Sequence, residues 1–191
     1  MAPRCYNSPM RISTKFTYED LQHFPPDRNR YEIVDGDLFV TPAPIPLHQR
    51  IVGNLHAELR QHVRKHRLGE VFVAPLDVVF KQETVLEPDI LFVSRRHLEI
   101  IGDKYLSGPP DLVVEVLSES SRRMDREIKP KQYALYGVAE FWRIDPEGKT
   151  VEIFRLEEDA YELVGSLGFG DELTSPLFPG LSLPVSSLWE S

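Results

Sequence analysis

The chain has 191 residues, 41% of them hydrophobic, with a single cysteine and a formal net charge of −8. That length fills one domain and is short for two, so we expect a single domain over residues 1–191 with its core at about 18–183. The acidic balance argues against a protein that coats nucleic acid without specificity, because such proteins are usually basic. A nuclease is compatible with it, since only the contact face must be positive.

The composition also bears on the compartment. No apolar run reaches the length of a membrane span, and the residues at 1–16 lack the hydrophobic stretch of a signal peptide. Cys5 has no second cysteine for an internal disulfide, which suits a reducing environment. We therefore expect a cytoplasmic protein without membrane contact.

The N-terminal third predicts a short helix, a hairpin and a long helix. Thr17 begins a capping-box pattern, and the Pro25-Pro26 pair ends the helix that follows it. Asp35-Gly36 between two alternating runs indicates a hairpin over residues 31–41. From residue 47 to 67, apolar residues recur at helical spacing, which predicts an amphipathic helix that lies across a sheet.

The rest of the chain predicts a sheet with further helical and hairpin segments. A basic stretch at 122–136, followed by Gly137, indicates a helix with a glycine C-cap. Residues 151–164 indicate an added hairpin, and the proline-punctuated apolar segment 173–189 packs on the domain or on a partner subunit. Buried strands are predicted at 70–80, 89–93, 111–117 and 141–145. The fold class is thus α/β (α+β), with a mixed central β-sheet flanked by helices and an added β-hairpin.

Two of these strands carry a carboxylate each. Asp89 follows Glu87-Pro88 and leads into an apolar run, and Glu115 interrupts the apolar run at 112–117. A buried unpaired charge is costly, and a shared divalent cation would make both carboxylates tolerable. The alternatives are that Asp89 only begins a strand after a proline turn, and that Glu115 forms a buried ion pair with Lys129 or Arg123.

Several short motifs occur in one order from about residue 18 to 183. They are Tyr31–Gly36, His48-Gln49, Glu87–Asp89, Val114–Ser118, Asp125 with Lys129 and Tyr133, and Gly137–Trp142. This ordered set resembles the Uma-type restriction endonuclease family, within the PD-(D/E)XK nuclease superfamily. The resemblance implies a restriction-endonuclease-like fold.

The resemblance also implies a set of catalytic residues. In the superfamily the first acid and the second acid bind the metal, and these positions are Asp89 and Glu115. A lysine usually stands two residues after the second acid, but that position is Leu117 here. In the Uma-type branch the lysine lies on the following helix, which matches Lys129. Pro130 disfavours helical geometry at Lys129, so this helix is expected to start late or to bend.

Four further residues are candidates of second rank. His48 is a proton carrier or phosphate ligand near the metal by resemblance, with packing or capping as the alternative. Glu32 is an additional acidic ligand or an exposed strand residue. Asp125 is expected to cap the helix that carries Lys129, and Tyr133 to belong to the core or to support the site.

The basic residues form separate clusters along the chain. For Arg60, Arg64, Lys65 and Arg67 we expect a solvated helix end whose cations complement the helix dipole. The cluster at 122–131 lies close to Glu115 in sequence, which favours a functional role.

The leading hypothesis is a Mg²⁺-dependent endonuclease, with Mn²⁺ as a substitute metal, which hydrolyses DNA phosphodiester bonds through a metal-activated water. Symmetric cutting of both strands favours a homodimer. Leu117 and Pro130 keep open a catalytically inactive nuclease-fold module for DNA binding or protein interaction. A third hypothesis is a metal-dependent hydrolase of a smaller phosphate ester.

Overall fold

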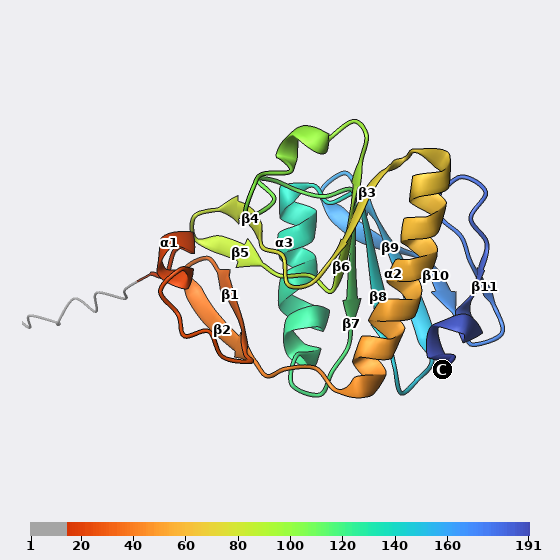
Figure 1. Ribbon diagram of the computed structural model, residues 1–191, viewed down its shortest axis with the longest axis horizontal. Coiled ribbons are helices and arrows are strands. Elements are labelled where there is room, and N and C mark those ends of the chain that lie inside the picture. Colours follow the sequence, from red (N-terminus) through yellow and green to blue (C-terminus); the bar gives the residue numbers. More distant parts are fainter. Residues whose placement is uncertain (1–14) are drawn as a thin grey trace, which may run out of the picture.

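The structure is a computed structural model that describes residues 15–191, so Cys5 lies outside the described residues. The chain forms a central six-stranded sheet in the order β10-β9-β8-β7-β6-β3, a four-stranded sheet in the order β2-β1-β5-β4, and a two-stranded sheet of β11 and β12. Figure 1 shows the central sheet between helices α2 and α3. The strands are β1 (Arg30–Val34), β2 (Asp37–Thr41), β3 (Gly69–Val73), β4 (Val78–Lys81), β5 (Thr84–Leu86), β6 (Ile90–Ser94), β7 (Leu112–Val116), β8 (Glu140–Asp145), β9 (Thr150–Glu157), β10 (Ala160–Leu167), β11 (Glu172–Leu173) and β12 (Leu183–Pro184). The α-helices are α1 (Tyr18–Leu21), α2 (Pro46–His66) and α3 (Lys129–Tyr136), with 3₁₀ turns at Leu98–Ile100 and Val185–Trp189 and a π turn at Met124–Ile128.

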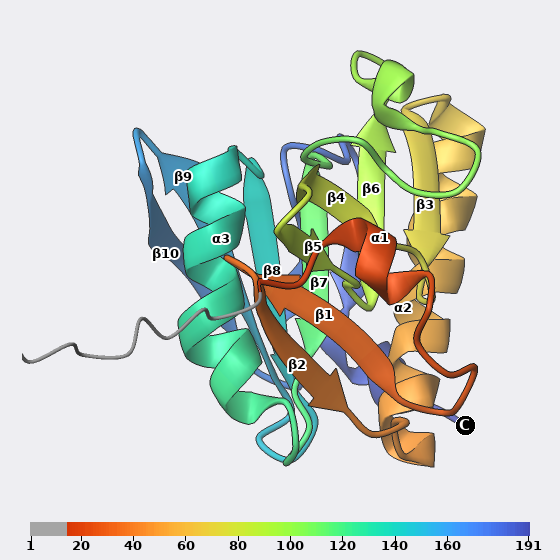
Figure 2. The same ribbon diagram turned by 90° about the vertical axis from the view of Figure 1, so that its left-hand side faces the viewer.

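The central sheet is mixed. β7 and β8 are parallel, whereas β6 pairs antiparallel with both β7 and β3, and β9 pairs antiparallel with both β8 and β10. Helix α2 and the C-terminal segment cover one face, while α3 and the four-stranded sheet cover the other (Figure 2). The predicted mixed sheet flanked by helices is therefore confirmed.

Side-chain alternation decides which residues face the site. Phe92 and Val114 belong to the core with α2, whereas Leu91 and Val113 belong to the clusters on the opposite face. Because successive side chains in a strand point to opposite faces, Glu115 lies on the same face as Val113. The second carboxylate of the predicted pair thus points toward α3.

Some predicted elements differ from the observed ones. Residues 70–80 form two strands rather than one, β3 in the central sheet and β4 in the four-stranded sheet. Pro75 lies between them and has no backbone N–H to donate to a strand ladder. The added hairpin is present as β9 and β10, and it extends the central sheet at its edge.

The helix predicted over 122–136 contains a π turn just before Lys129. The Lys129 backbone N–H donates to the Met124 carbonyl, five residues back, and α3 begins at Lys129. In a regular α-helix the ring of Pro130 would clash with the carbonyl four residues earlier. The wider π turn accommodates the proline, so the helix continues through Lys129 and ends at Gly137 in the left-handed conformation.

Among the residues that the structure describes, no helix combines the length and the apolar character that crossing a membrane requires.

The C-terminal segment packs on the domain, as one of the two predicted alternatives. The Asn54 side chain of α2 donates to the carbonyls of Ser187, Leu188 and Glu190. Phe178 is fully buried, with its ring centroid 4.8 Å from that of Phe92. The segment therefore completes the core between α2 and the central sheet.

Because this core depends on Phe178, we expect Phe178→Ala to lower the free energy of unfolding by about 3–5 kcal/mol, as measured by urea denaturation. The matched control is Phe169→Ala in the same part of the chain, where the ring is 46% exposed, and its cost should stay below about 1 kcal/mol. Equal losses in the two variants would contradict a core role for the segment.

Candidate active site

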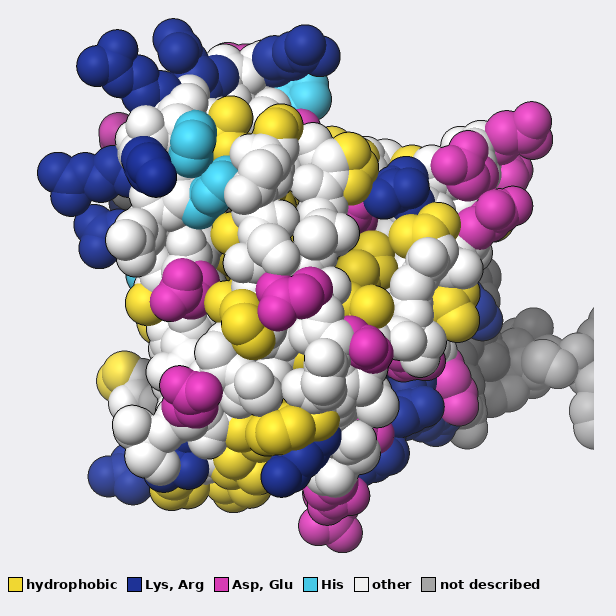
Figure 3. All heavy atoms as spheres, turned by 90° about the vertical axis from the view of Figure 1, so that its right-hand side faces the viewer, with side chains coloured by type: hydrophobic (Ala, Val, Ile, Leu, Met, Phe, Trp, Pro, Cys, Tyr) yellow, Lys and Arg dark blue, Asp and Glu magenta, His cyan; other side chains and the backbone are white. Residues whose placement is uncertain are grey.

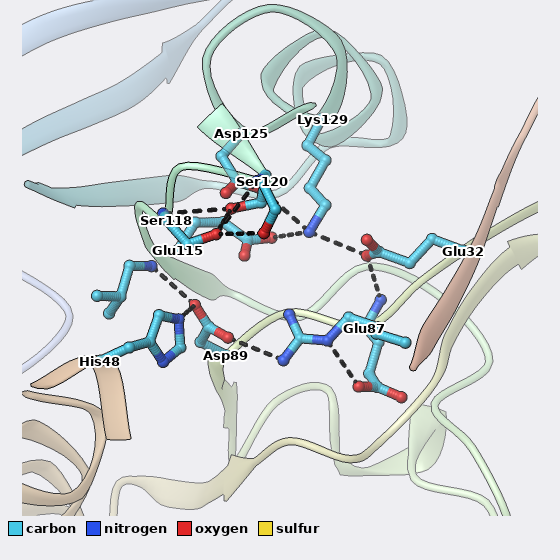
Figure 4. A network of polar contacts seen from close by, with 12 residues as sticks. Glu32, His48, Glu87, Asp89, Glu115, Ser118, Ser120, Asp125 and Lys129 are labelled. Atoms are coloured by element: carbon cyan, nitrogen blue, oxygen red, sulfur yellow. Dashed lines mark hydrogen bonds and ion pairs between the residues drawn. The ribbon is translucent and has the colours of Figure 1, made fainter. Parts of the chain in front are cut away.

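The two predicted metal ligands lie next to each other at one end of the central sheet (Figure 4). Ile90 pairs with Val114 across the antiparallel strands β6 and β7. By this register, Asp89 before β6 and Glu115 near the end of β7 are neighbours. Both side chains are buried. The two carboxylates that the sequence analysis pairs are therefore neighbours in the structure.

Lys129 reaches back from α3 to this pair. Its Nζ lies 3.0 Å from Glu115 Oε1, 2.9 Å from Glu32 Oε1 and 3.2 Å from Asp125 Oδ1. The hydroxyl of Tyr133, one turn further along α3, donates to the same Glu115 oxygen. One ammonium group therefore connects β1, β7 and the helix that carries it.

Asp89 has a different set of partners. Its Oδ2 accepts from the Val116 backbone N–H at 2.8 Å and lies 3.1 Å from His48 Nε2. Its Oδ1 accepts from Arg30 Nη2 at 3.0 Å, and Arg30 Nε lies 2.8 Å from Glu87 Oε1. Asp89 is thus held by the N-terminal part of α2, by β7 and by β1.

The site contains more carboxylates than cations. The charged members of the two networks are Glu32, Glu87, Asp89, Glu115 and Asp125 against Arg30 and Lys129. Removal of so many charges from water is costly, and the two cations compensate only part of it. The site therefore has more carboxyl groups than cations to neutralise them.

This imbalance separates the pKa values of the carboxyl groups. Burial alone would raise the pKa of Asp89, but His48 and Arg30 outweigh it and lower that pKa to about 2. Burial raises the pKa of Glu87 to about 7 despite Arg30, and raises that of Glu115 well above its usual value despite Lys129. Asp89 is therefore firmly ionised, while Glu115 lies in a region that favours an added positive charge.

A cavity of about 280 Å³ opens beside these residues. Its lining includes His48, Asp89, Ser118 and Ser121. The Ser118 and Ser121 hydroxyl oxygens are 2.7 Å apart, and Ser118 Oγ also accepts from the Ser121 backbone N–H. The cavity thus brings these hydroxyl groups close to Asp89.

The donor set suits a hard divalent cation. Buried carboxylate oxygens in excess are the ligands that Mg²⁺ and Mn²⁺ prefer. Among residues 15–191, no group of three or more His, Cys, Asp or Glu side chains is placed so that it could hold a metal ion as it stands. Arg30 and Lys129 explain this, since each guanidinium or ammonium group occupies carboxylate oxygens that a cation would otherwise bind.

A sequence model of the family described as "Uma2: Putative restriction endonuclease" matches residues 17–186. The chain belongs to the Uma2 family. None of the curated proteins matches the sequence. Among solved structures, the fold is similar to that of "a putative nuclease belonging to DUF820" from Anabaena variabilis, with a TM-score of 0.75 over 91% of this chain and 97% of that one. Their sequence identity is 19%, so this likeness supports the fold alone.

In this Uma2-family chain, the structure decides between several of the alternatives. Glu32 is buried against Lys129 and is not an exposed strand residue. Asp125 lies inside the π turn rather than at a helix N-cap, and it contacts Lys129 directly. Arg123 pairs with Glu127 on the surface, so Lys129 is the ion-pair partner of Glu115.

Two charged members of the site, Arg30 and Glu87, are not predicted from the sequence. Arg30 lies directly before the hairpin motif, two residues before Glu32 on β1. Residues two apart on a strand face the same side, so this spacing is the one sequence feature that places Arg30 beside Glu32. Glu87 stands in the Glu87–Asp89 motif, which does not by itself indicate a role for its side chain. Ser118 ends the Val114–Ser118 motif, but neither Ser118 nor Ser121 has a local pattern that indicates a role in a site, since hydroxyl residues are common in loops.

Lys129 is predicted to be essential to the stability of this Uma2-family fold. Lys129→Met would leave Glu32, Glu115 and Asp125 without their shared cation, so the free energy of unfolding should fall by about 3–5 kcal/mol in urea denaturation at neutral pH. The control is Lys131→Met, an exposed lysine two residues away, with an expected change within about 0.5 kcal/mol. A small loss for Lys129→Met would mean that the carboxylates are neutral or solvated.

Proposed function

We propose that this protein is a Mg²⁺-dependent endonuclease, with Mn²⁺ as a substitute, that hydrolyses DNA phosphodiester bonds at the cavity lined by Asp89, with Glu115 on the neighbouring strand. The observation that carries the proposal is the group of carboxyl side chains at this cavity. Glu87, Asp89 and Asp125 line it, and Glu115 is buried on the strand next to Asp89. Membership of a restriction endonuclease family supports a nuclease, and such families generally use divalent metals.

Asp89 and Glu115 would hold the metal ion. When bound, Mg²⁺ supplies positive charge for the phosphate oxygens and lowers the pKa of a coordinated water. Arg30 is the residue that must leave Asp89 for this, because it occupies Oδ1. It can stay attached to Glu87 through Nε and so keep its guanidinium beside the cavity, where it can bind a substrate phosphate.

His48 is suited to accept a proton. Its Nε2 faces the ionised Asp89, so Nε2 carries the hydrogen and Nδ1 has a free lone pair. Within residues 15–191, the buried Nδ1 atom has no hydrogen-bond partner. Asp89 fixes the tautomer, and His48 then serves as the general base for a water near the cavity.

Lys129 positions Glu115 rather than contacting the substrate. The ammonium group is almost fully buried and is shared by the three carboxylates around it. It holds Glu115 in a single orientation together with the Tyr133 hydroxyl. Ser118 and Ser121, which line the cavity, offer hydroxyl donors to the phosphate oxygens.

Nicking and linearisation of supercoiled plasmid with Mg²⁺ tests this function. We expect Asp89→Asn and Glu115→Gln each to reduce the cleavage rate at least about 100-fold, because each removes a negative metal ligand without changing the shape of the side chain. The control is Glu119→Gln, an exposed acid near the cavity, with unchanged cleavage. Wild-type protein that leaves the plasmid intact with both Mg²⁺ and Mn²⁺ would refute the nuclease proposal.

Metal binding can be tested without catalysis through Arg30. We expect Arg30→Met to lower the melting temperature on the order of 10 °C without metal, because Asp89 and Glu87 lose their counter-ion. Mg²⁺ should then raise the melting temperature of Arg30→Met more than that of the wild type, since the cation has no competitor. The control is the exposed Arg28→Met. Equal Mg²⁺ shifts in all three proteins would contradict competition between Arg30 and the metal.

One observation favours a second candidate function, an inactive nuclease-fold module for DNA binding or interaction. Both cations of the site are already engaged by carboxylates, Arg30 by Asp89 and Glu87 and Lys129 by its three partners. DNA binding that needs no metal and leads to no cleavage would identify this case. The homodimer stays a prediction, which light scattering in solution checks.

A further inference from the structure

We propose that the exposed face of α2 is a track for the phosphate backbone of duplex DNA, which runs from the candidate active site along the length of the helix. This inference rests on the proposed function, because the track is meant to hold the DNA that the cavity cleaves. It concerns residues that lie outside the acidic site and that the proposed chemistry does not use.

The track is an arginine stripe along one side of α2 and its C-cap. Residues 50, 53, 57, 60, 64 and 67 follow each other at intervals of three or four residues, which keeps them on one side of the helix, and all are exposed. They are Arg50, Gly53, Ala57, Arg60, Arg64 and Arg67. The buried residues Ile51, Leu55 and Leu59 lie on the other side of the helix.

The small residues leave room for a close approach along this stripe. A side chain at Gly53 would meet no atom within 4 Å, and Ala57 adds only a methyl group. Four long guanidinium side chains therefore flank a shallow middle section. A DNA strand could lie against the helix there while arginines on both sides bind its phosphates.

The cations of the stripe are not used inside the protein. The ion pairs formed within residues 15–191 involve other lysines and arginines, and Arg50, Arg60, Arg64 and Arg67 belong to none of them. The sole acid on α2 is Glu58, which lies about 100° around the helix from Ala57. Glu70 of β3 lines the same hollow as Arg60 and Arg64 but forms no ion pair with them among the described residues. In a chain with a net charge of −8, the stripe is a local concentration of positive charge.

The stripe links the site to the far end of the molecule. Arg50 lies two residues after His48, which contacts Asp89, and Arg67 lies about 25 Å further along the helix axis. Figure 3 shows Lys and Arg side chains gathered at the top, the end where α2 finishes in Figure 1. Arg95 adds to this end, because its backbone N–H donates to Leu68 just beyond the helix.

The simpler explanation, that these cations complement the helix dipole, accounts for only part of the stripe. Dipole complementation acts within the last turn, which contains Arg64, Lys65 and His66. Arg60 lies before that turn. Arg50 lies near the N-terminal end, where the dipole disfavours a cation. The expectation of a merely solvated helix end therefore does not explain the pattern.

Duplex DNA fits this surface better than a membrane does. The stripe has no exposed aromatic or large aliphatic side chain, which a helix needs in order to insert into a lipid interface. Its length of about 25 Å corresponds to about seven base pairs at 3.4 Å per pair. A duplex laid along the stripe can therefore place phosphates against arginines near both ends of the helix, with Arg50 at the end that carries His48.

The test is binding of a fluorescent 24-base-pair duplex, followed by anisotropy in EDTA so that cleavage cannot interfere. At about 100 mM salt we expect Arg60→Gln/Arg64→Gln to weaken binding roughly 10-fold and to reduce the slope of log K against log salt by about 2. The control is Lys65→Gln/Lys104→Gln, which removes the same charge from exposed positions off the stripe and should change the affinity less than about 2-fold. Equal losses in both pairs would overturn the track in favour of a general charge effect.

A second variant pair examines the middle of the stripe without removal of an arginine. Ala57→Glu places an acid among the arginines and should weaken binding of the 24-base-pair duplex several-fold, whereas Ala57→Gln, of the same size, should cost much less. Both variants keep a good helix-forming residue, and their melting temperatures verify that they fold. Equal losses for Glu and Gln would mean that only bulk matters there, which contradicts an electrostatic track.

The outcomes separate this inference from the proposed function. If the stripe variants bind the duplex more weakly than the wild type, and the wild type never cuts plasmid, the results support the track and reject the nuclease. Plasmid cleavage with unchanged duplex affinity in every stripe variant would support the nuclease and overturn the track. If the stripe variants bind polyglutamate more weakly than the wild type but bind duplex DNA equally well, the DNA track is overturned and the surface is one for an acidic protein partner.

Discussion

The buried ammonium group of Lys129 is the interaction on which the site depends. It lies within 3.2 Å of carboxylates from Glu32, Glu115 and Asp125, and burial of these acids without it would be strongly unfavourable. The contacts tie β1 of the four-stranded sheet, β7 of the central sheet and the helical segment before α3 to one point. The two sheets thereby meet at the site through charge as well as through apolar packing.

The backbone of the helix is shaped by this demand. Asp125 and Lys129 are four residues apart and both point inward, but Pro130 cannot follow Lys129 in an ordinary helix interior without a clash. The π turn at Met124–Ile128 resolves the conflict. Such turns often mark functional positions in helices, and here the turn lets a proline-containing helix deliver a lysine to a strand that lacks one at Leu117.

The sequence alone indicated the elements that local patterns specify. The hairpin about Asp35-Gly36, α2, β6 to β8 and the Gly137 cap were predicted from period, turn residues and caps, and the ordered motifs placed Asp89, Glu115 and Lys129 in one site. It did not indicate the four-stranded sheet, because the pairing of Ile33 with Val85 joins strands distant in sequence. For the same reason Arg30 was missed: its partner Asp89 is 59 residues away, and no local pattern encodes that contact.

Helix α2 connects the acidic site to the arginine stripe. Its buried side contributes His48 to Asp89 near the N-terminal end and then packs along the central sheet. Its exposed side carries arginines at intervals that keep them in line with that end. A straight helix fixes the distance and angle between these two features, because its residues cannot move independently over about 25 Å. The side of α2 that faces the acidic site and the side that carries the arginines are opposite sides of one helix. An acidic protein can therefore bind a polyanion on the arginine side, away from the buried carboxylates.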